Sequence, residues 1–202
     1  MIKPQDVVNA DHPNTIPLLP LKDIVVFPHM IIPVFINEDL CISAVDDALT
    51  QDRKIFLSAF KSDDQAAQQT PGLESSLEAP FDVYDIGTVC TVMRTRKLPD
   101  GRVKVLVQGL YKAKISRLLK SQPHPLVETT KISDPMTEST GADVEALVRA
   151  VREHLEKVVS LGKALSPDIL MILEDVKEPG RLADLVASNL GLKVPESQSV
   201  LS

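Results

Sequence analysis

The sequence of 202 residues is poor in aromatic side chains and in cysteine, and it has no excess of positive charge. Aromatic residues make up 3% of the chain and tryptophan is absent, so few side chains could stack on the bases of single-stranded nucleic acid. The net charge of −6 argues against general binding of duplex nucleic acid or of anionic membranes, because both need a cationic surface. Cys41 and Cys90 are too few for a metal cluster or a disulfide framework, and we expect both to be small buried side chains.

Segments that would direct the chain to a membrane are also missing. Residues 1–14 have no apolar core of the kind that defines a signal peptide. No apolar run approaches the roughly 18 residues that a membrane-spanning helix needs. Two cysteines that are expected to stay reduced suit a reducing compartment. The sequence therefore predicts a soluble, cytoplasmic protein with no membrane partner.

The sequence lacks the motifs that carry common catalytic chemistry. The pair Gly162-Lys163 has no preceding glycine of a phosphate-binding loop, and there is no G-x-S-x-G motif. None of the four histidines has the spacing of a zinc site. Adjacent acids such as Asp46-Asp47 are expected to be structural rather than paired for acid–base catalysis. We expect no catalytic residue, metal or cofactor in this chain, although a serine–lysine pair stays open because nothing singles one out.

Up to about residue 132, the chain consists of short apolar runs separated by prolines and turns. Runs that are rich in β-branched residues and bounded by proline are typical of strands, and the prolines favour edges or corners of a sheet. Leu98–Gly101 predicts a turn, and Gln108–Leu110 predicts a bulge. Apolar residues spaced as i, i+4, i+7 and i+8 predict one helix over about 38–50. We expect strands at residues 16–21, 24–27, 31–36, 54–60, 83–94, 103–107, 112–118 and 126–132.

After about residue 135, the apolar residues change from the two-residue period of strands to the 3.6-residue period of helices. We expect one long helix over about 142–161. Ser166-Pro167 and Glu178-Pro179 each combine a helix-capping position with proline at the first helical position, and Gly191 is a suitable stop. Pro195-Glu196 predicts another helix so close to the last residue that we expect the chain to continue into further modules.

These patterns predict an α+β fold in two parts. Residues 1–14 form a flexible tail, residues 15–134 a β-rich subdomain and residues 135–202 a helical subdomain. The scarcity of helices between the strands favours an antiparallel or mixed, curled sheet over a parallel one. The polar and aperiodic residues 61–80 predict a long exposed loop.

Basic residues are concentrated in one stretch of this acidic chain. Residues 93–120 hold nine basic side chains and one acidic side chain, whereas residues 37–92 hold three basic and eleven acidic ones. One interpretation is a solvated outer face that also pairs with the acidic segment. Another is a patch that binds an acidic partner, and nucleic acid is the least favoured partner. The candidate residues of such a patch are Arg94, Arg96, Lys97, Arg102 and Lys104.

Three blocks, in order along the chain, resemble the N-terminal domain of bacterial Lon, a family of ATP-dependent proteases. Ile16–Phe35 has the sequence IPLLPLKDIVVFPHMIIPVF, Gly87–Leu110 contains KLPDGRVKVLVQGL, and Asp175–Leu192 is centred on EPGRLAD. Together the blocks cover the chain from about residue 15 to about residue 195, which is far more than one short motif.

The resemblance implies a PUA-like β pseudo-barrel lobe followed by an α-helical bundle lobe, in agreement with the two parts predicted from periodicity. In full-length members of the family, an ATPase module that binds ATP and Mg and a Ser-Lys peptidase follow in the same chain. Neither module is present in this sequence, so the resemblance implies a non-catalytic domain without a cofactor of its own. It also implies recognition of unfolded or damaged proteins and support of a homohexamer of Lon subunits, in protein quality control and the stress response.

The sequence departs from the family pattern after Phe35. Glu38 stands where an arginine is usual, and Leu40 stands where a lysine is usual. If those basic residues make a contact in relatives, that contact is altered here. The segment 61–80 is also longer than is usual in the family.

Capture of unfolded proteins needs exposed apolar surface, because unfolded and folded chains differ chiefly in the apolar side chains that they expose. Flexible methionine side chains suit contacts with varied partners. Two alternatives stay open: a stand-alone adaptor with a Lon-like fold, and a PUA-like module that binds nucleic acid or another polyanion. The candidate substrate-binding residues are Met30, Ile31, Pro33, Val34, Met93 and Leu98.

Overall fold

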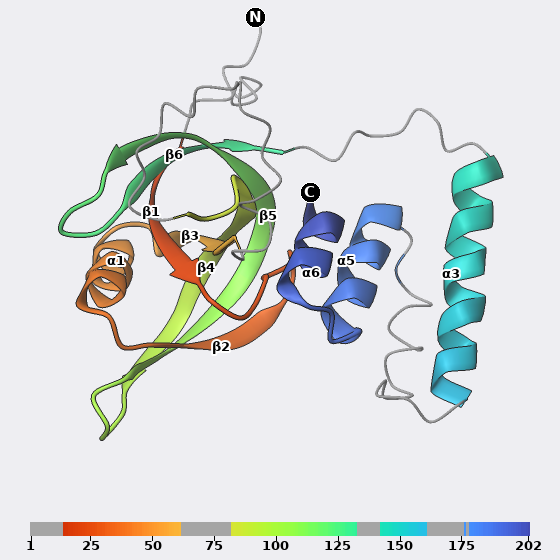
Figure 1. Cartoon of the computed structure of the whole chain (residues 1–202), viewed down its shortest axis with the longest axis horizontal. Helices are drawn as coiled ribbons and strands as arrows, with labels where there is room; N and C mark the ends of the chain where they lie inside the picture. Colours follow the sequence, from red (N-terminus) through yellow and green to blue (C-terminus); the bar gives the residue numbers. More distant parts are fainter. Residues whose placement is uncertain (1–13, 62–81, 133–141, 161–175, 177) are drawn as a thin grey trace, which may run out of the picture. The chain divides into compact units, whose positions relative to one another are not determined.

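The computed structural model in Figure 1 describes residues 14–61, 82–132, 142–160, 176 and 178–202. The chain divides into two compact units, Met1–Ile132 and Ser133–Ser202. The fold class is α+β, as predicted, because the first unit is built on a sheet and the second on helices. The expected tail, the expected loop after Lys61 and the helix expected at Ser166-Pro167 lie outside the described residues.

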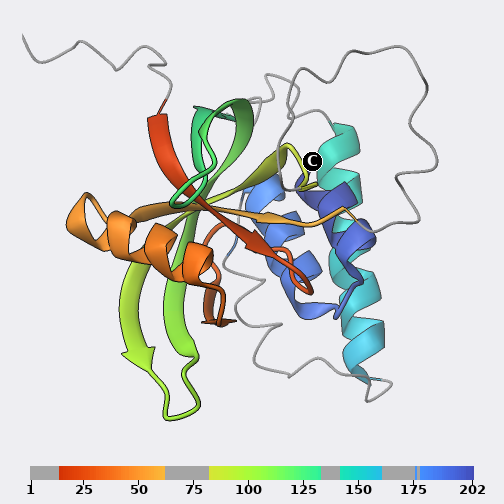
Figure 2. The ribbon, with the colours of Figure 1, turned by 60° about the vertical axis from the view of Figure 1, so that its left-hand side comes forward.

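Among its described residues, the first unit contains a six-stranded sheet and one helix. Their bounds are β1 Asn14–Leu21, β2 Ile31–Ile36, α1 Asp39–Thr50, β3 Lys54–Ala59, β4 Ile86–Lys97, β5 Val103–Lys120 and β6 Leu126–Lys131. The strands lie in the order β2-β5-β4-β3-β1-β6, with β1 parallel to β3 and the other pairs antiparallel. Strand β6 also pairs with β5, so β5, β4, β3, β1 and β6 close into a barrel (Figures 1 and 2).

The long strand β5 connects β2 to this barrel. Its first half pairs with β2 on one side and β4 on the other, and in its second half β6 takes the place of β2. The pairing of β4 with β5 skips Leu110 and Met93, so each is the extra residue of a β-bulge. Bulges bend strands, and this bending explains how β5 can pair with β2 in its first half and with β6 in its second half. The bulge predicted at 108–110 is confirmed, whereas the separate strands predicted at 103–107 and 112–118 are one continuous strand.

The prediction of a strand at Ile24–Phe27 is wrong. These residues belong to no strand, although most of the segment is buried. The segment crosses β5 instead: the backbone N–H of His29 donates to the carbonyl of Gly109 at 2.9 Å, and the N–H of Gly109 donates to the carbonyl of Met30 at 2.9 Å. A Cβ atom on Gly109 would lie 2.3 Å from the carbonyl oxygen of Phe27, so glycine alone permits this close crossing. The apolar residues of Ile24–Phe27 are therefore explained by their burial and not by pairing in the sheet.

Helix α1 packs its apolar face against the sheet (Figure 2). Its buried residues recur at helical spacing, and they are Cys41, Ala44, Val45 and Ala48. They share one core with residues of β1, β3 and β4, including Leu19, Ile55 and Cys90. Both cysteines are therefore buried as predicted. Burial raises the pKa of both thiols, that of Cys41 to about 11.

The second unit contains the helices α3 Ala142–Ser160, α5 Pro179–Asn189 and α6 Val194–Leu201. All three follow the predicted positions. Glu178 caps the start of α5 with Pro179 in its first turn, and Gly191 ends that helix region with a positive φ of 62°. Leu155 of α3, Val176 and Leu182 of α5 form a shared buried cluster. Among the helices that the structure describes, none is long and apolar enough to cross a membrane.

Candidate functional site

Alternate residues of β2 point away from the barrel. Ile31 and Phe35 expose 54% and 51% of their surface, and Pro33 between them is also exposed. Val34 and Ile36, which alternate with them, are buried. This alternation follows from the two-residue period of a strand, which sends successive side chains to opposite faces. One face of β2 is therefore an exposed apolar strip.

The sheet register places basic residues beside this strip. Pro33 lies opposite Leu106 of β5, which lies opposite Arg94 of β4. Phe35 lies opposite Lys104, which lies opposite Arg96. Together with Met93, the exposed bulge residue of β4, and Arg102, the residue before β5, these side chains form one surface. We call it the outer face, and it consists of Ile31, Pro33, Phe35, Met93, Arg94, Arg96, Arg102, Lys104 and Leu106.

Cations and apolar groups are in direct contact on the outer face. The guanidinium carbon of Arg102 and the Nζ of Lys104 each lie 5.7 Å from the centroid of the Phe35 ring, within the range of cation–π attraction. A shallow cleft of about 350 Å³ lies next to them, lined by Arg94, Thr95, Arg96, Lys104 and Leu106. This surface can therefore contact both an apolar side chain and an anionic group of one ligand.

Most cations of the outer face have no acidic partner among the residues that the structure describes. Arg102 is paired: its Nε donates to the Asp100 carboxylate at 2.7 Å, and the guanidinium lowers the pKa of that carboxyl. Within the described ranges, Arg94, Arg96 and Lys104 form no ion pair. The pairing of these residues with the acidic segment, one of the two interpretations of the sequence, is therefore not seen in this part of the chain.

The other predicted binding residues are distributed differently. Val34 does not belong to an exposed surface, because its side chain faces the core with 6% of its surface exposed. Met30 is half-buried against the same core, and its sulfur accepts the N–H of Phe27 at 3.3 Å. Leu98 is half-buried in the turn before β5. Lys97 pairs with the inward-facing Val103, so it lies on the opposite side of β4 from Arg96.

Sequence reasoning missed two residues of the outer face, Phe35 and Leu106. The signal that could have found Phe35 is the alternation Ile31-Pro33-Phe35 within a predicted strand. The same alternation would have excluded Val34. Leu106 becomes visible only when the register of β5 against β2 and β4 is known.

A second cleft, of about 300 Å³, lies between the segment Pro20–Ile24 and the end of β2. Lys22 Nζ donates to Glu38 Oε1 at 2.9 Å among its lining residues. Glu38 is thus paired with a cation. Ile24 and Phe35 supply exposed apolar surface to the same cleft, so it continues the outer face beyond β2.

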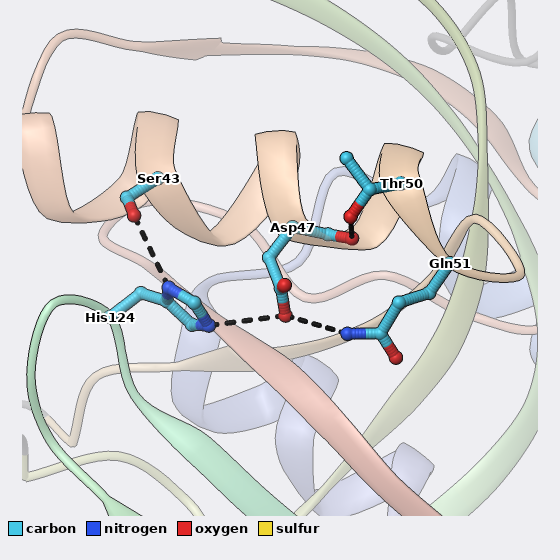
Figure 3. Close-up of polar contacts among 5 residues, drawn as sticks. All are labelled: Ser43, Asp47, Thr50, Gln51 and His124. Atoms are coloured by element: carbon cyan, nitrogen blue, oxygen red, sulfur yellow. Dashed lines mark hydrogen bonds and ion pairs between the residues drawn. The ribbon is translucent and has the colours of Figure 1, made fainter.

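A buried histidine connects α1 to the segment before β6 (Figure 3). His124 Nε2 lies 3.2 Å from Asp47 Oδ2, and His124 Nδ1 lies 3.2 Å from Ser43 Oγ. Gln51 Nε2 donates to the same carboxylate at 2.8 Å. Serine, histidine and aspartate carry catalysis in serine hydrolases, but neither cleft described above includes any of these three residues. We interpret the contacts as a structural link, in line with the structural role expected for Asp46-Asp47.

The described residues show no group of three or more histidine, cysteine, aspartate or glutamate side chains that could hold a metal ion. The outer face combines an apolar strip with Arg94, Arg96 and Lys104, which form no ion pair with the described residues, and it is therefore the strongest candidate for a functional site. Its chemistry suits binding of a flexible polypeptide.

Comparison with known proteins identifies the family of this chain. Residues 15–202 match the family described as the ATP-dependent protease La (LON) substrate-binding domain. The chain is 46% identical over 189 residues to Lon protease 2 of Bdellovibrio bacteriovorus and 48% identical over 189 residues to the Lon protease of Geobacter metallireducens. Each match covers 94% of this chain and 22% of the relative, so the chain spans about a fifth of the length of these relatives.

The fold is also that of a solved relative. The N-terminal domain of Mycobacterium avium complex Lon protease superposes with a TM-score of 0.71 at 17% identity, covering 94% of this chain and 90% of that domain. The resemblance inferred from three sequence blocks is thus confirmed over almost the whole chain. This chain belongs to the family of Lon protease substrate-binding domains.

Proposed function

We propose that this domain recognises unfolded or damaged protein segments through the outer face and leaves peptide cleavage to other modules of a Lon protease. The observation that carries the proposal is the exposure of Ile31 and Phe35, at 54% and 51%, on an ordered strand. Large apolar side chains exposed side by side are unfavourable in water and commonly mark a binding surface. Unfolded chains offer the matching apolar groups.

Weak binding at each site is sufficient for this role. Under the proposal the chain works in the cytoplasm, as one subunit of a homohexamer that carries an ATPase and a Ser-Lys peptidase. Several copies of the outer face held in one assembly raise the effective concentration of each for a long unfolded chain. Avidity of this kind favours extended clients with several apolar segments over folded proteins with few.

The test compares the apolar strip of the outer face with an exposed apolar residue elsewhere in the sheet. The double variant Ile31→Asp/Phe35→Asp removes the apolar strip, and Leu119→Asp is the matched control because Leu119 is exposed at 44% in the far half of β5. Binding of a fluorescently labelled, reduced and carboxymethylated model protein is measured by anisotropy. We expect the double variant to bind roughly tenfold more weakly, a loss of about 1.4 kcal/mol, and the control to bind like the unchanged chain.

Equal loss of binding in both variants would show that exposed apolar area in general, rather than the outer face, captures the client. Unchanged binding in the double variant would contradict the proposed site. Circular dichroism spectra of all three proteins establish that the variants are folded, which we expect because the substituted side chains are exposed.

A further inference from the structure

We propose that the outer face selects extended segments in which apolar and acidic residues alternate. This inference rests on the proposed function and names the kind of unfolded segment that binds best. It follows from how two rows of side chains are placed. Ile31, Pro33 and Phe35 of β2 form an apolar lane, and Arg94 and Arg96 of β4 form a basic lane.

The two lanes run side by side with β5 between them. Pro33, Leu106 and Arg94 form one row across the three strands, and Phe35, Lys104 and Arg96 form the next. Neighbouring strands lie about 4.8 Å apart, so the lanes are separated by about 10 Å. Within a lane, side chains recur about every 7 Å, because every second residue of a strand faces the same way.

An extended segment that lies over β5 meets both lanes at once. Its successive side chains point to opposite sides and recur about every 7 Å on each side, which matches the spacing within the lanes. One set of side chains would lie over the apolar lane and the other over the basic lane. The cleft of about 350 Å³ between Leu106 and the basic lane offers room for the second set. The sequence that suits this arrangement alternates apolar with anionic residues.

Charge complementarity decides which charge the peptide side chains over the basic lane should carry. Arg94, Arg96 and Lys104 form no ion pair with the described residues, so a carboxylate of a bound segment has none of the described acids to displace. Lys104 of β5, which lies between the two lanes, holds its Nζ 5.7 Å from the centroid of the Phe35 ring and adds a third cation beside the basic lane. A basic segment would place like charges next to this surface and be repelled.

A polypeptide fits this surface better than a nucleic acid does. Half of the outer face is apolar and offers nothing to a phosphate backbone. Phe35 is the aromatic residue of the outer face, and two cations flank its ring. Nucleic acid would engage the basic lane only, whereas an alternating apolar–acidic peptide would engage both lanes.

The test uses the whole 202-residue chain and four labelled peptides of matched length. The peptides, each about ten residues long to span the lanes, alternate Val with Glu, Val with Gln or Val with Lys, and a fourth places the same Val and Glu residues in two blocks. We expect the alternating Val–Glu peptide to bind roughly tenfold more tightly than the other three at low salt, by fluorescence anisotropy. Added salt should reduce this advantage, since the charges are exposed.

Two double variants test whether the basic lane causes the preference for the alternating Val–Glu peptide. Arg94→Glu/Arg96→Glu should remove the preference for Val–Glu and favour Val–Lys, whereas Lys114→Glu/Arg117→Glu, in the other half of β5, should keep the original order.

If the Val–Gln peptide or the blocked peptide binds as tightly as the alternating Val–Glu peptide, the inference fails while apolar capture stands. If no peptide binds and the denatured model protein also does not, the proposed function itself fails. Tighter binding of a short single-stranded DNA, lost in Arg94→Glu/Arg96→Glu, would overturn the inference in favour of a polyanion site.

Discussion

The two faces of β2 both carry apolar side chains, but in opposite environments. Val34 and Ile36 expose 6% and 5% of their surface, whereas Ile31 and Phe35 on the same strand expose 54% and 51%. Burial of a large apolar side chain contributes roughly 1.5–3 kcal/mol to folding, and the outward pair obtains little of this. Folding therefore accounts for the inward face of β2 and leaves the outward face unexplained, and the proposed function assigns a binding role to that face.

The largest expected effect comes from placing the same charge on each face in turn. Val34→Asp buries a carboxylate without a partner, so we expect it to lower the free energy of unfolding by about 4 kcal/mol or more. Phe35→Asp places the same group in solvent, and we expect a change within about 0.5 kcal/mol. Urea unfolding followed by circular dichroism measures both.

The pair of variants also separates stability from binding. Phe35→Asp should weaken binding of the denatured model protein while leaving the unfolding midpoint in place. If Phe35→Asp unfolds as readily as Val34→Asp, the outward face is needed for folding, and the contrast between the two faces disappears.

A second expected effect concerns the crossing that leads the chain into β2. Gly109→Ala would place a Cβ atom 2.3 Å from the carbonyl oxygen of Phe27, and both groups belong to backbone that cannot easily move. We expect a loss of about 2–3 kcal/mol, at the upper end of typical overpacking. Differential scanning calorimetry measures it as a lower melting temperature.

Gly101→Ala is the matched control for this change. Gly101 has a positive φ of 84° but no atom within 4 Å of an added Cβ, so only backbone strain of about 1 kcal/mol is expected. A smaller loss for Gly109→Ala than for Gly101→Ala would contradict the close crossing. Binding of the denatured model protein by Gly109→Ala should weaken as well, because the crossing fixes the start of the apolar lane.

Sequence patterns predicted most of the elements that build the outer face, since local periodicity decides them. The run Ile31–Ile36 alternates as a strand, and the turn before Val103 has its own signature in Pro99-Asp100-Gly101. The prediction of binding residues treated Met30, Ile31, Pro33 and Val34 as one neighbourhood. Successive residues of a strand point to opposite faces, so Val34 faces the core and does not share the exposed face of Ile31 and Pro33.

Other features depend on contacts between distant parts of the chain. Ile24–Phe27 has the composition of a strand, and only the crossing at Gly109 shows that it is buried without sheet pairing. Likewise, the composition of residues 93–120 reveals an excess of cations but not their partners. That Arg102 is paired with Asp100 while Arg94 and Arg96 form no ion pair within the described ranges depends on the three-dimensional arrangement.

The smallest expected effect concerns the two buried thiols and applies only at alkaline pH. Burial, with a smaller contribution from the Glu38 carboxylate, raises the pKa of Cys41 to about 11, and burial raises that of Cys90 as well. The thiols of the unfolded chain have a pKa near 8.5. Because the pKa of each thiol is higher in the folded chain than in the unfolded chain, the free energy of unfolding falls as the pH rises above about 8.5. Near pH 7 the thiols do not change it.

Thiol reactivity tests this burial directly, since the thiolate is the reactive form. We expect both cysteines of the folded chain to react with a disulfide reagent at about pH 8 far more slowly than in urea, where burial is lost. The variant Cys90→Ala leaves Cys41 as the only thiol and reports on the wall of the cleft beside β2. Rapid labelling of Cys41 in the folded variant would show that the cleft opens to its sulfur, and the inward side of α1 would then be less closed than the burial of Val34 and Ile36 implies.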